Sequence, residues 1–401
     1  MRSRIVGCAV LAAAVVGASP AFSAPSGNVR WCIGKDTTGA FGQVVSQYNK
    51  AHPNVKVSLR ELPTSADAQR TQLVQRQQAK SSECDVLGLD TIWTAEFAAQ
   101  GWLKDVTGAL RKRQAQFIPS TLGSARYQGK LWAVPFNTNA GFLYYNKSKI
   151  TKPPTTWQQA YQMARSRGGI GYQGARYEGL TVNFLELLYG AGGSVLSRDG
   201  KKATINSPQA QRVLAFMQQG IRDKAAPRAV LTYMEQESKN AFETGKVALL
   251  RNWPYVYALA KKAKVNFDIV PLPAWQGGKA ASVLGGYNLG LSAYSKNAAA
   301  AQSFIDYATS PAAQKKFFIQ SALPAVLTQT YKDRTVRAKV PFAAELLKAV
   351  QQGRPRPVSP VNPQISQAIY DNVYAALSKG TAPKTALSNA QKQIDKALKT
   401  F

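Results

Sequence analysis

Three short apolar runs near the start of the chain decide its fold: VRWCI at residues 29–33, VKVSL at 55–59 and DVLGL at 85–89. Two stretches between them are expected to be helical. Residues 41–51 carry apolar side chains at helical spacing, and residues 66–80 are polar and helix-prone. Strands that alternate with helices in this order form a parallel sheet covered by helices on both faces. The opening of the chain therefore predicts an α/β fold.

The rest of the chain also mixes strands with helices and is long enough for a second lobe. Its apolar runs predict strands at 247–250, 267–270 and 287–293. Its helical periodicity predicts helices at 156–167, 182–190, 207–222, 236–245, 298–309, 311–320 and 383–399. The chain has 401 residues, 45% of them hydrophobic, so two domains or lobes with substantial cores are expected.

The first residues are typical of an export signal. Arg2 and Arg4 precede an apolar run over 5–18, and small residues follow at 19–24. That run is shorter than the ~20 residues that span a bilayer. We therefore predict a signal peptide over residues 1–23 and a soluble periplasmic product.

Export leaves two cysteines, Cys32 and Cys84, because Cys8 lies inside the signal. An even number of cysteines in an oxidising compartment favours a disulfide. Each cysteine lies in or next to a predicted strand, and the two thiols meet if those strands are parallel neighbours. Closing a loop of this size would stabilise the fold by about 4 kcal/mol in the chain-entropy model.

The charge first suggests a nucleic-acid or membrane partner, because 51 Lys and Arg face 21 Asp and Glu, a net charge of +30. The basic clusters at 111–113 and 261–264 lack interleaved aromatic residues, so nucleic acid is not expected as a partner. Residues 169–174 match GxGxxG but follow a predicted helix rather than a strand. The single histidine, His52, lies in a predicted turn. We expect no metal, no cofactor and no catalytic residue.

Aromatic and polar residues gather where predicted strands end. Asp90 follows the third strand, Trp253 and Tyr255 follow strand 247–250, and Tyr287 follows Gly285-Gly286, where a backbone can approach a ligand closely. Open α/β sheets bind ligands outside the carboxyl ends of their strands. Aromatic faces stack on sugar rings, while carboxylates and amides bind hydroxyls. The pattern therefore predicts a sugar site.

Several short segments, spread over the chain, together carry a family resemblance. They are QGARYEGL at 173–180, YYNK at 144–147, NWPY at 252–255, LGGY at 284–287 and RPV at 356–358. With these segments the chain resembles the extracellular solute-binding proteins of ABC sugar importers, specifically their trehalose/maltose-binding branch. The resemblance implies a two-lobed type II periplasmic-binding-protein fold with the ligand cleft at the hinge. It implies one lobe of residues 27–136 plus 289–330 and another of 137–288 plus 331–401.

The resemblance also implies a set of ligand-binding residues. These are Asp36, Thr64, Arg70, Asp90, Asn137, Asn139, Trp253, Tyr255, Gly285, Gly286, Tyr287 and Arg356. The chain departs from the family pattern at several positions. Asn139 replaces an aspartate, Asn137 replaces a tyrosine, Tyr287 replaces a tryptophan, and Val361-Asn362 replaces a pair of tyrosines. A family arginine falls at Gln69, with Arg70 beside it. These changes reduce the stacking area and remove one charged acceptor.

The function implied by the resemblance is delivery of a sugar to ABC permease subunits in the inner membrane. The expected ligand is an α-linked disaccharide or short oligosaccharide, bound by a monomer without covalent chemistry. Two alternatives stay open at this point. One is a binder of an anionic solute such as a glycerol phosphodiester, and the other is a secreted glycosidase with two carboxylates about 5–9.5 Å apart.

Overall fold

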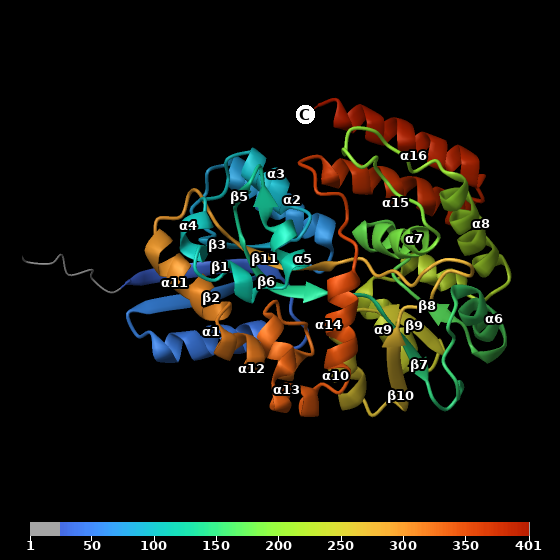
Figure 1. Cartoon of the computed structure of the whole chain (residues 1–401), viewed down its shortest axis with the longest axis horizontal. Helices are drawn as coiled ribbons and strands as arrows, with labels where there is room; N and C mark the ends of the chain where they lie inside the picture. The colour runs from blue at the N-terminus through green and yellow to red at the C-terminus, as the bar shows by residue number, and fades with distance from the viewer. Residues whose placement is uncertain (1–24, 401) are drawn as a thin grey trace, which may run out of the picture.

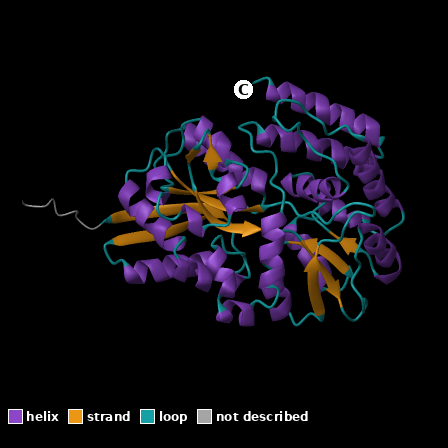
Figure 2. Ribbon diagram, in the orientation of Figure 1, coloured by secondary structure: helices purple, strands orange, loops and turns teal. Residues whose placement is uncertain are grey.

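Two α/β lobes lie side by side in the computed structural model, which describes residues 25–400 (Figure 1). The predicted signal peptide lies outside the described residues. Helices surround a sheet in each lobe (Figure 2). The predicted two-lobed α/β fold is confirmed. No helix in the described part of the chain is both long and apolar enough to cross a bilayer.

The first lobe is built on a five-stranded sheet of order β2-β1-β3-β11-β6. Its strands are β1 (Gly27–Gly34), β2 (Val55–Leu62), β3 (Val86–Asp90), β6 (Val134–Asn139) and β11 (Gly285–Leu291). β1 pairs in parallel with β2 and β3, as the alternating pattern predicts. β11 runs antiparallel to both of its neighbours, β3 and β6, which the pattern does not predict.

The direction of β11 explains how its glycines reach the site. Tyr287 lies opposite Asp90 in the β11–β3 pairing. Because β11 is antiparallel, the start of this strand lies at the same sheet edge as the carboxyl end of β3. Gly285 and Gly286 therefore reach the ligand edge of the sheet from the beginning of their strand.

The second lobe has a four-stranded sheet of order β10-β7-β9-β8. Its strands are β7 (Phe142–Asn146), β8 (Ile170–Gly171), β9 (Leu249–Asn252) and β10 (Phe267–Pro271). β7 is antiparallel to β9 and β10, and β8 is parallel to β9. A small separate hairpin joins β4 (Arg126–Tyr127) to β5 (Lys130–Leu131).

Helices cover both sheets, and most of the predicted ones form within a few residues of their expected bounds. In chain order they are α1 (Ala40–Ala51), α2 (Ala66–Gln78), α3 (Thr94–Ala99), α4 (Thr107–Leu110), η1 (Gln114–Gln116), α5 (Pro119–Ser124), α6 (Trp157–Arg167), α7 (Glu178–Gly190), α8 (Pro208–Arg222), η2 (Arg228–Thr232), α9 (Glu235–Glu243), α10 (Val256–Lys262), α11 (Ala298–Ala308), α12 (Pro311–Ser321), η3 (Thr328–Lys332), α13 (Arg334–Lys339), α14 (Ala343–Gln352), α15 (Asn362–Lys379) and α16 (Pro383–Leu398).

Two of these helices begin at a Ser-Pro pair, for a local physical reason. The side chain of Ser207 accepts a hydrogen bond from the backbone N–H of Ala210 at 3.2 Å, and Ser310 does the same for Ala313 at 3.3 Å. Each serine satisfies an N–H that has no partner within its helix, and the proline that follows has no N–H to satisfy. The sequence thus defines the starts of α8 and α12.

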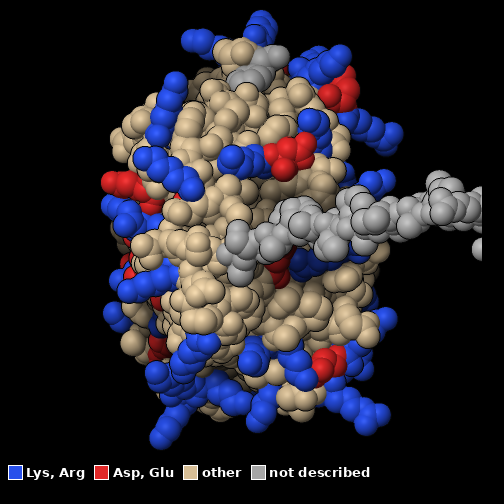
Figure 3. Space-filling view, turned by 90° about the vertical axis from the view of Figure 1, so that its left-hand side faces the viewer, with Lys and Arg blue, Asp and Glu red and all other residues tan. Residues whose placement is uncertain are grey.

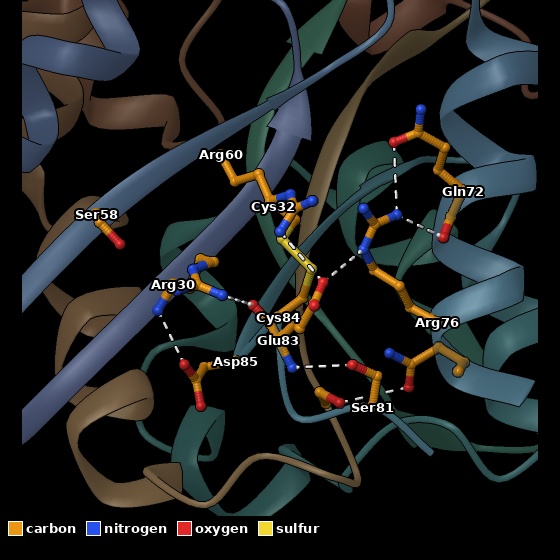
Figure 4. Close-up of a disulfide and its surroundings, with 12 residues drawn as sticks. Arg30, Cys32, Ser58, Arg60, Gln72, Arg76, Ser81, Glu83, Cys84 and Asp85 are labelled. Carbon is orange, nitrogen blue, oxygen red and sulfur yellow. Dashed lines mark hydrogen bonds and ion pairs between the residues drawn. A yellow bond between two sulfur atoms is a disulfide. The ribbon is translucent and has the colours of Figure 1, made fainter. Parts of the chain in front are cut away.

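The predicted disulfide between Cys32 and Cys84 is confirmed (Figure 4). It joins Cys32 in β1 to Cys84, which lies just before β3, and the two Cα atoms are 5.7 Å apart. Glu83, beside the bridge, accepts a hydrogen bond from Arg60 at 3.1 Å, and its carboxylate lies 3.4 Å from Arg76. The bridge therefore reinforces the parallel pairing of β1 with β3.

The chain crosses between the lobes at three places. It leaves β6 for β7, returns to β11, and crosses again on the way from α14 to α15 (Figure 1). The residue-level lobe boundaries stay a proposal. α13 lies against α12 and η3, and α14 contacts both α5 and β10. These contacts favour ending the first lobe after α14 rather than near residue 330.

Candidate functional site

A cavity between the lobes brings the predicted site residues together. Its volume is about 1200 Å³ when its opening to solvent is included. Eleven of the twelve predicted ligand-binding residues line it. These are Asp36, Thr64, Asp90, Asn137, Asn139, Trp253, Tyr255, Gly285, Gly286, Tyr287 and Arg356. Their contact with a ligand stays a prediction, but both lobes supply them.

The twelfth residue, Arg70, does not line the cavity. Its guanidinium binds the carboxylate of Glu96, with 2.8 Å between Nε and Oε2. The preceding residue, Gln69, lines the cavity instead and accepts a hydrogen bond from the Tyr287 hydroxyl at 3.0 Å. On a helix, neighbouring residues point about 100° apart, so an offset of one residue turns the side chain away from the site.

Several lining residues were absent from the sequence prediction. They include Lys35, Thr38, Tyr177, Glu178, Met234, Glu235, Gln236 and Glu237. Tyr177 and Glu178 belong to the segment 173–180, so the resemblance contained a signal for them. The residues at 234–237 form the start of α9, where no motif marks them. They reach the cavity only because the lobes pack together.

Arg356 lies at the junction of the two lobes and is only 4% exposed. One terminal nitrogen is 2.6 Å from Asp90 of the first lobe, and the other is 2.8 Å from Glu178 of the second. A buried guanidinium without such partners would be strongly destabilising. The remaining carboxylate oxygen of Glu178 accepts a hydrogen bond from the Ser366 hydroxyl. Arg356 thus bridges the lobes.

The carboxyl group of Glu178 has an unusually high pKa. Burial raises its pKa to about 7; the Arg356 guanidinium opposes this shift, and the nearby Asp90 charge adds to it. Because Arg356 is shared with Asp90, it compensates Glu178 only in part. The site therefore holds a carboxyl group that titrates near neutral pH.

Trp253 is held from behind by a buried ion pair. The Arg251 guanidinium lies 4.1 Å from the ring centroid of Trp253. It also binds both carboxylate oxygens of Glu186 at 2.6 Å, and its other terminal nitrogen is 2.8 Å from Gln173. Arg251 and Glu186 are each 1% exposed. The ring therefore rests on a rigid, fully hydrogen-bonded support.

The glycines at the start of β11 leave room for neighbouring groups. Gly286 has φ of +112°, and a Cβ there would lie 2.2 Å from the backbone oxygen of Asn137. A Cβ on Gly285 would lie 3.2 Å from the ring of Trp253. Gly286 is therefore needed for its backbone conformation, and Gly285 is needed for the close approach of Trp253. They also allow Trp253 to reach the hinge strands.

The two hinge asparagines differ in what they leave for a ligand. The Oδ1 of Asn137 accepts the backbone N–H of Tyr287 at 3.1 Å, so this oxygen is already engaged. The Oδ1 of Asn139 is buried and has no hydrogen-bond partner among the described residues. Buried polar atoms are normally satisfied, so Asn139 is the better candidate for ligand contact.

Asp36 also lines the cavity, but its carboxylate holds the loop that leads into α1. It accepts the backbone N–H groups of Thr38 and Phe41, each at 2.8 Å. These bonds satisfy donors at the start of the helix. The structure therefore assigns Asp36 a structural contact that the sequence did not predict.

Two comparisons of sequence bear on this arrangement. The model of the family described as bacterial extracellular solute-binding protein matches residues 34–315. A probable ABC transporter-binding protein of Deinococcus radiodurans is 33% identical to this chain over 362 residues, which cover 84% of this chain and 86% of the relative.

Solved structures share the fold along nearly the whole chain. The maltose-bound MalE3 of T. maritima is 32% identical with a TM-score of 0.87, covering 93% of this chain and 99% of that protein. A solute-binding protein of Thermotoga lettingae bound with alpha-D-tagatose is 24% identical with a TM-score of 0.86, covering 93% and 100%. The second likeness concerns the fold alone.

Proposed function

The chain belongs to the family of bacterial extracellular solute-binding proteins, and from this premise we propose that it captures an α-linked disaccharide or short oligosaccharide for an ABC importer. The protein binds this sugar in the periplasm between its two lobes. It then delivers the sugar to permease subunits in the inner membrane. No covalent chemistry takes part.

The observation that carries the proposal is the composition of the cavity wall. Trp253 and Tyr255 offer aromatic surface from the second lobe, and the free Oδ1 of Asn139 lies at the hinge. Sugar rings have apolar faces that pack on aromatic rings, while their hydroxyls need hydrogen-bond partners. The 32% identity with a maltose-bound protein supports an α-linked glucoside as the ligand class.

Binding would work by a shift between open and closed lobe arrangements. A sugar that contacts residues of both lobes, such as Asn139 and Trp253, stabilises the closed arrangement over the open one. A ligand shifts such an equilibrium only by its difference in affinity for the two states. The permease then distinguishes loaded protein from empty protein by lobe position.

The proposal is tested by calorimetric titration of the mature protein with maltose, trehalose and glucose. We expect saturable binding of at least one α-linked disaccharide. Trp253→Ala should weaken that binding by at least ~2 kcal/mol, about 30-fold, because a buried aromatic anchor is lost. Trp132→Ala, which lies outside the cavity, serves as the control and should bind normally. Absence of binding by every neutral sugar, or an unchanged Trp253→Ala, would refute the proposal.

A further inference from the structure

The cavity has the opposite charge balance to the molecule as a whole. The face shown in Figure 3 carries many Lys and Arg and few acids, in keeping with a net charge of +30. The cavity, in contrast, is lined by five carboxyl groups and two basic side chains. The carboxyl groups are those of Asp36, Asp90, Glu178, Glu235 and Glu237, and the basic groups are those of Lys35 and Arg356.

Four of these five carboxyl groups already accept hydrogen bonds or pair with a cation. The donors are the N–H groups of Thr38 and Phe41 for Asp36, Arg356 for Asp90 and Glu178, and the N–H of Met234 for Glu237. The carboxylate of Glu235 forms no ion pair and accepts no well-formed hydrogen bond among the described residues, and its polar neighbours are the Tyr177 hydroxyl and the Trp253 indole. It is therefore the carboxylate in this wall that is most open to a ligand.

Glu235 is positioned firmly by its place in the fold. It is the first residue of α9, and its backbone oxygen accepts hydrogen bonds from Asn252 at 3.1 Å and Ser238 at 3.0 Å. Its side chain is half-buried. Burial raises the pKa of Glu235, while the neighbouring Tyr177 lowers it in part. A half-buried carboxylate of this kind gains most from a cation or strong donor.

The Tyr177 hydroxyl belongs to the same part of the wall, beside the Glu235 carboxylate. Tyr177 lines the cavity and is 5% exposed, and its hydroxyl forms no well-formed hydrogen bond among the described residues. That hydroxyl lies against Gly179, where a Cβ would be 2.2 Å away, and Gly179 also lines the cavity. A buried hydroxyl without a partner is uncommon in folded proteins. A polar ligand group would satisfy it.

The cavity has little to offer an anion. Both terminal nitrogens of Arg356 are held by Asp90 and Glu178, so two carboxyl groups already match its charge, and only its buried Nε has no partner among the described residues. Lys35 is exposed. A phosphate or carboxylate on the ligand would therefore face Glu235 without a free buried cation, whereas a protonated amine would be attracted.

We propose that Glu235 selects ligands by charge: its carboxylate binds a protonated amino group on the sugar and repels a phosphate or carboxylate group. This inference rests on the proposed function and ranks sugars that carry a protonated amine above neutral sugars within its ligand class. A neutral sugar can still donate a hydroxyl to Glu235, but it lacks the ionic attraction. The anionic solutes left open by the sequence then bind this cleft more weakly than neutral sugars do.

The test compares three kinds of matched ligand on three proteins at pH 7. The ligands are maltose, its monoamino derivatives with one hydroxyl replaced at carbon 2 or carbon 6, and maltose phosphate. The proteins are the mature chain, Glu235→Gln and the control Glu345→Gln. Glu345 is exposed on α14 and does not line the cavity, so its substitution makes the same charge change away from the ligand. Thermal melting of each variant verifies folding.

We expect an amino derivative to bind the unsubstituted protein about tenfold tighter than maltose, and maltose phosphate about tenfold weaker. Glu235→Gln should remove both differences and leave maltose within about threefold, whereas Glu345→Gln should retain both. Equal binding of the three ligands, or differences that survive in Glu235→Gln, would overturn this inference alone. Binding of none of the three would overturn the proposed function with it. If Glu235→Gln misfolds, the order of the ligand affinities on the unsubstituted protein still tests this inference.

Discussion

Among single residues, Arg251 shows how a cavity wall depends on groups behind it. Its guanidinium lies under Trp253 and is neutralised by Glu186, with both side chains almost completely buried. We expect the cation to limit the movement of the ring, so that less conformational freedom is lost when a ligand packs on it. Arg251 therefore acts on the ligand through Trp253, as a positioning residue.

Replacing this support should weaken both the fold and sugar binding. Arg251→Met leaves Glu186 buried without a cation, which costs about 3–5 kcal/mol of unfolding free energy. The double variant Arg251→Met/Glu186→Leu removes the stranded charge and should regain most of that stability. We still expect it to bind sugar more weakly, because Trp253 has lost its support. Urea unfolding and calorimetric titration measure the two effects.

The double variant separates positioning from stability. If it is stable and binds as tightly as the unsubstituted protein, Arg251 serves the fold only. A control that truncates a pair far from the cavity, Arg165→Met/Asp223→Leu, should change sugar binding little.

The sequence allowed much of this site to be predicted, and the exceptions have physical causes. Asp90 and Tyr287 reach the cavity from one edge of the first lobe's sheet, and Trp253 reaches it from the end of β9 in the second lobe. Arg70 does not, because its direction depends on a helix register that one residue changes. Glu235 could not be found, since only the packing of the second lobe brings α9 to the wall.

At the scale of elements, local signals predicted strands and helices better than their mutual directions. The alternation of strands with helices near the chain start predicted the parallel β1–β3 neighbours, and they form. The antiparallel direction of β11 is not a local property, because the chain enters it from the other lobe. α7 begins at Glu178, earlier than residue 182, because its first turn is held by contacts that are distant in sequence.

The disulfide between β1 and the start of β3 should act on stability and leave binding unchanged. Replacing both cysteines, Cys32→Ser/Cys84→Ser, removes a closed loop with a sequence separation of 52 residues. The unfolded chain then gains freedom, so we expect a loss of about 4 kcal/mol in the free energy of unfolding. Urea unfolding under non-reducing conditions measures the loss.

Neither cysteine lines the cavity, so sugar affinity of the double serine variant should stay within about twofold of normal. Reduction of the unsubstituted protein provides the matched control and should reproduce the same stability loss. A loss below about 1 kcal/mol would contradict the chain-entropy account of this bridge.

In the whole molecule, the two lobes are joined by charged contacts as well as by the connecting chain. Arg356 binds Asp90 of the first lobe and Glu178 of the second. The backbone N–H of Glu178 also donates to Asp67 of α2 in the first lobe, at 3.2 Å. The start of α7 is therefore the point where titration of one group affects the packing of both lobes.

The pKa of Glu178, about 7 in the folded protein against an ordinary 4.5, predicts a pH dependence of stability. Between these values the folded state binds more protons than the unfolded state, so the contribution of Glu178 to stability falls as pH rises from about 4.5 to about 7. The isosteric Glu178→Gln cannot titrate. The quantity to compare is the difference in unfolding free energy, unsubstituted protein minus Glu178→Gln. This difference should decrease by at least about 1 kcal/mol between pH 5 and pH 8. Urea unfolding at both pH values measures it. An increase over the same interval would mean that attraction to Arg356 outweighs burial and holds the pKa of Glu178 below its ordinary value.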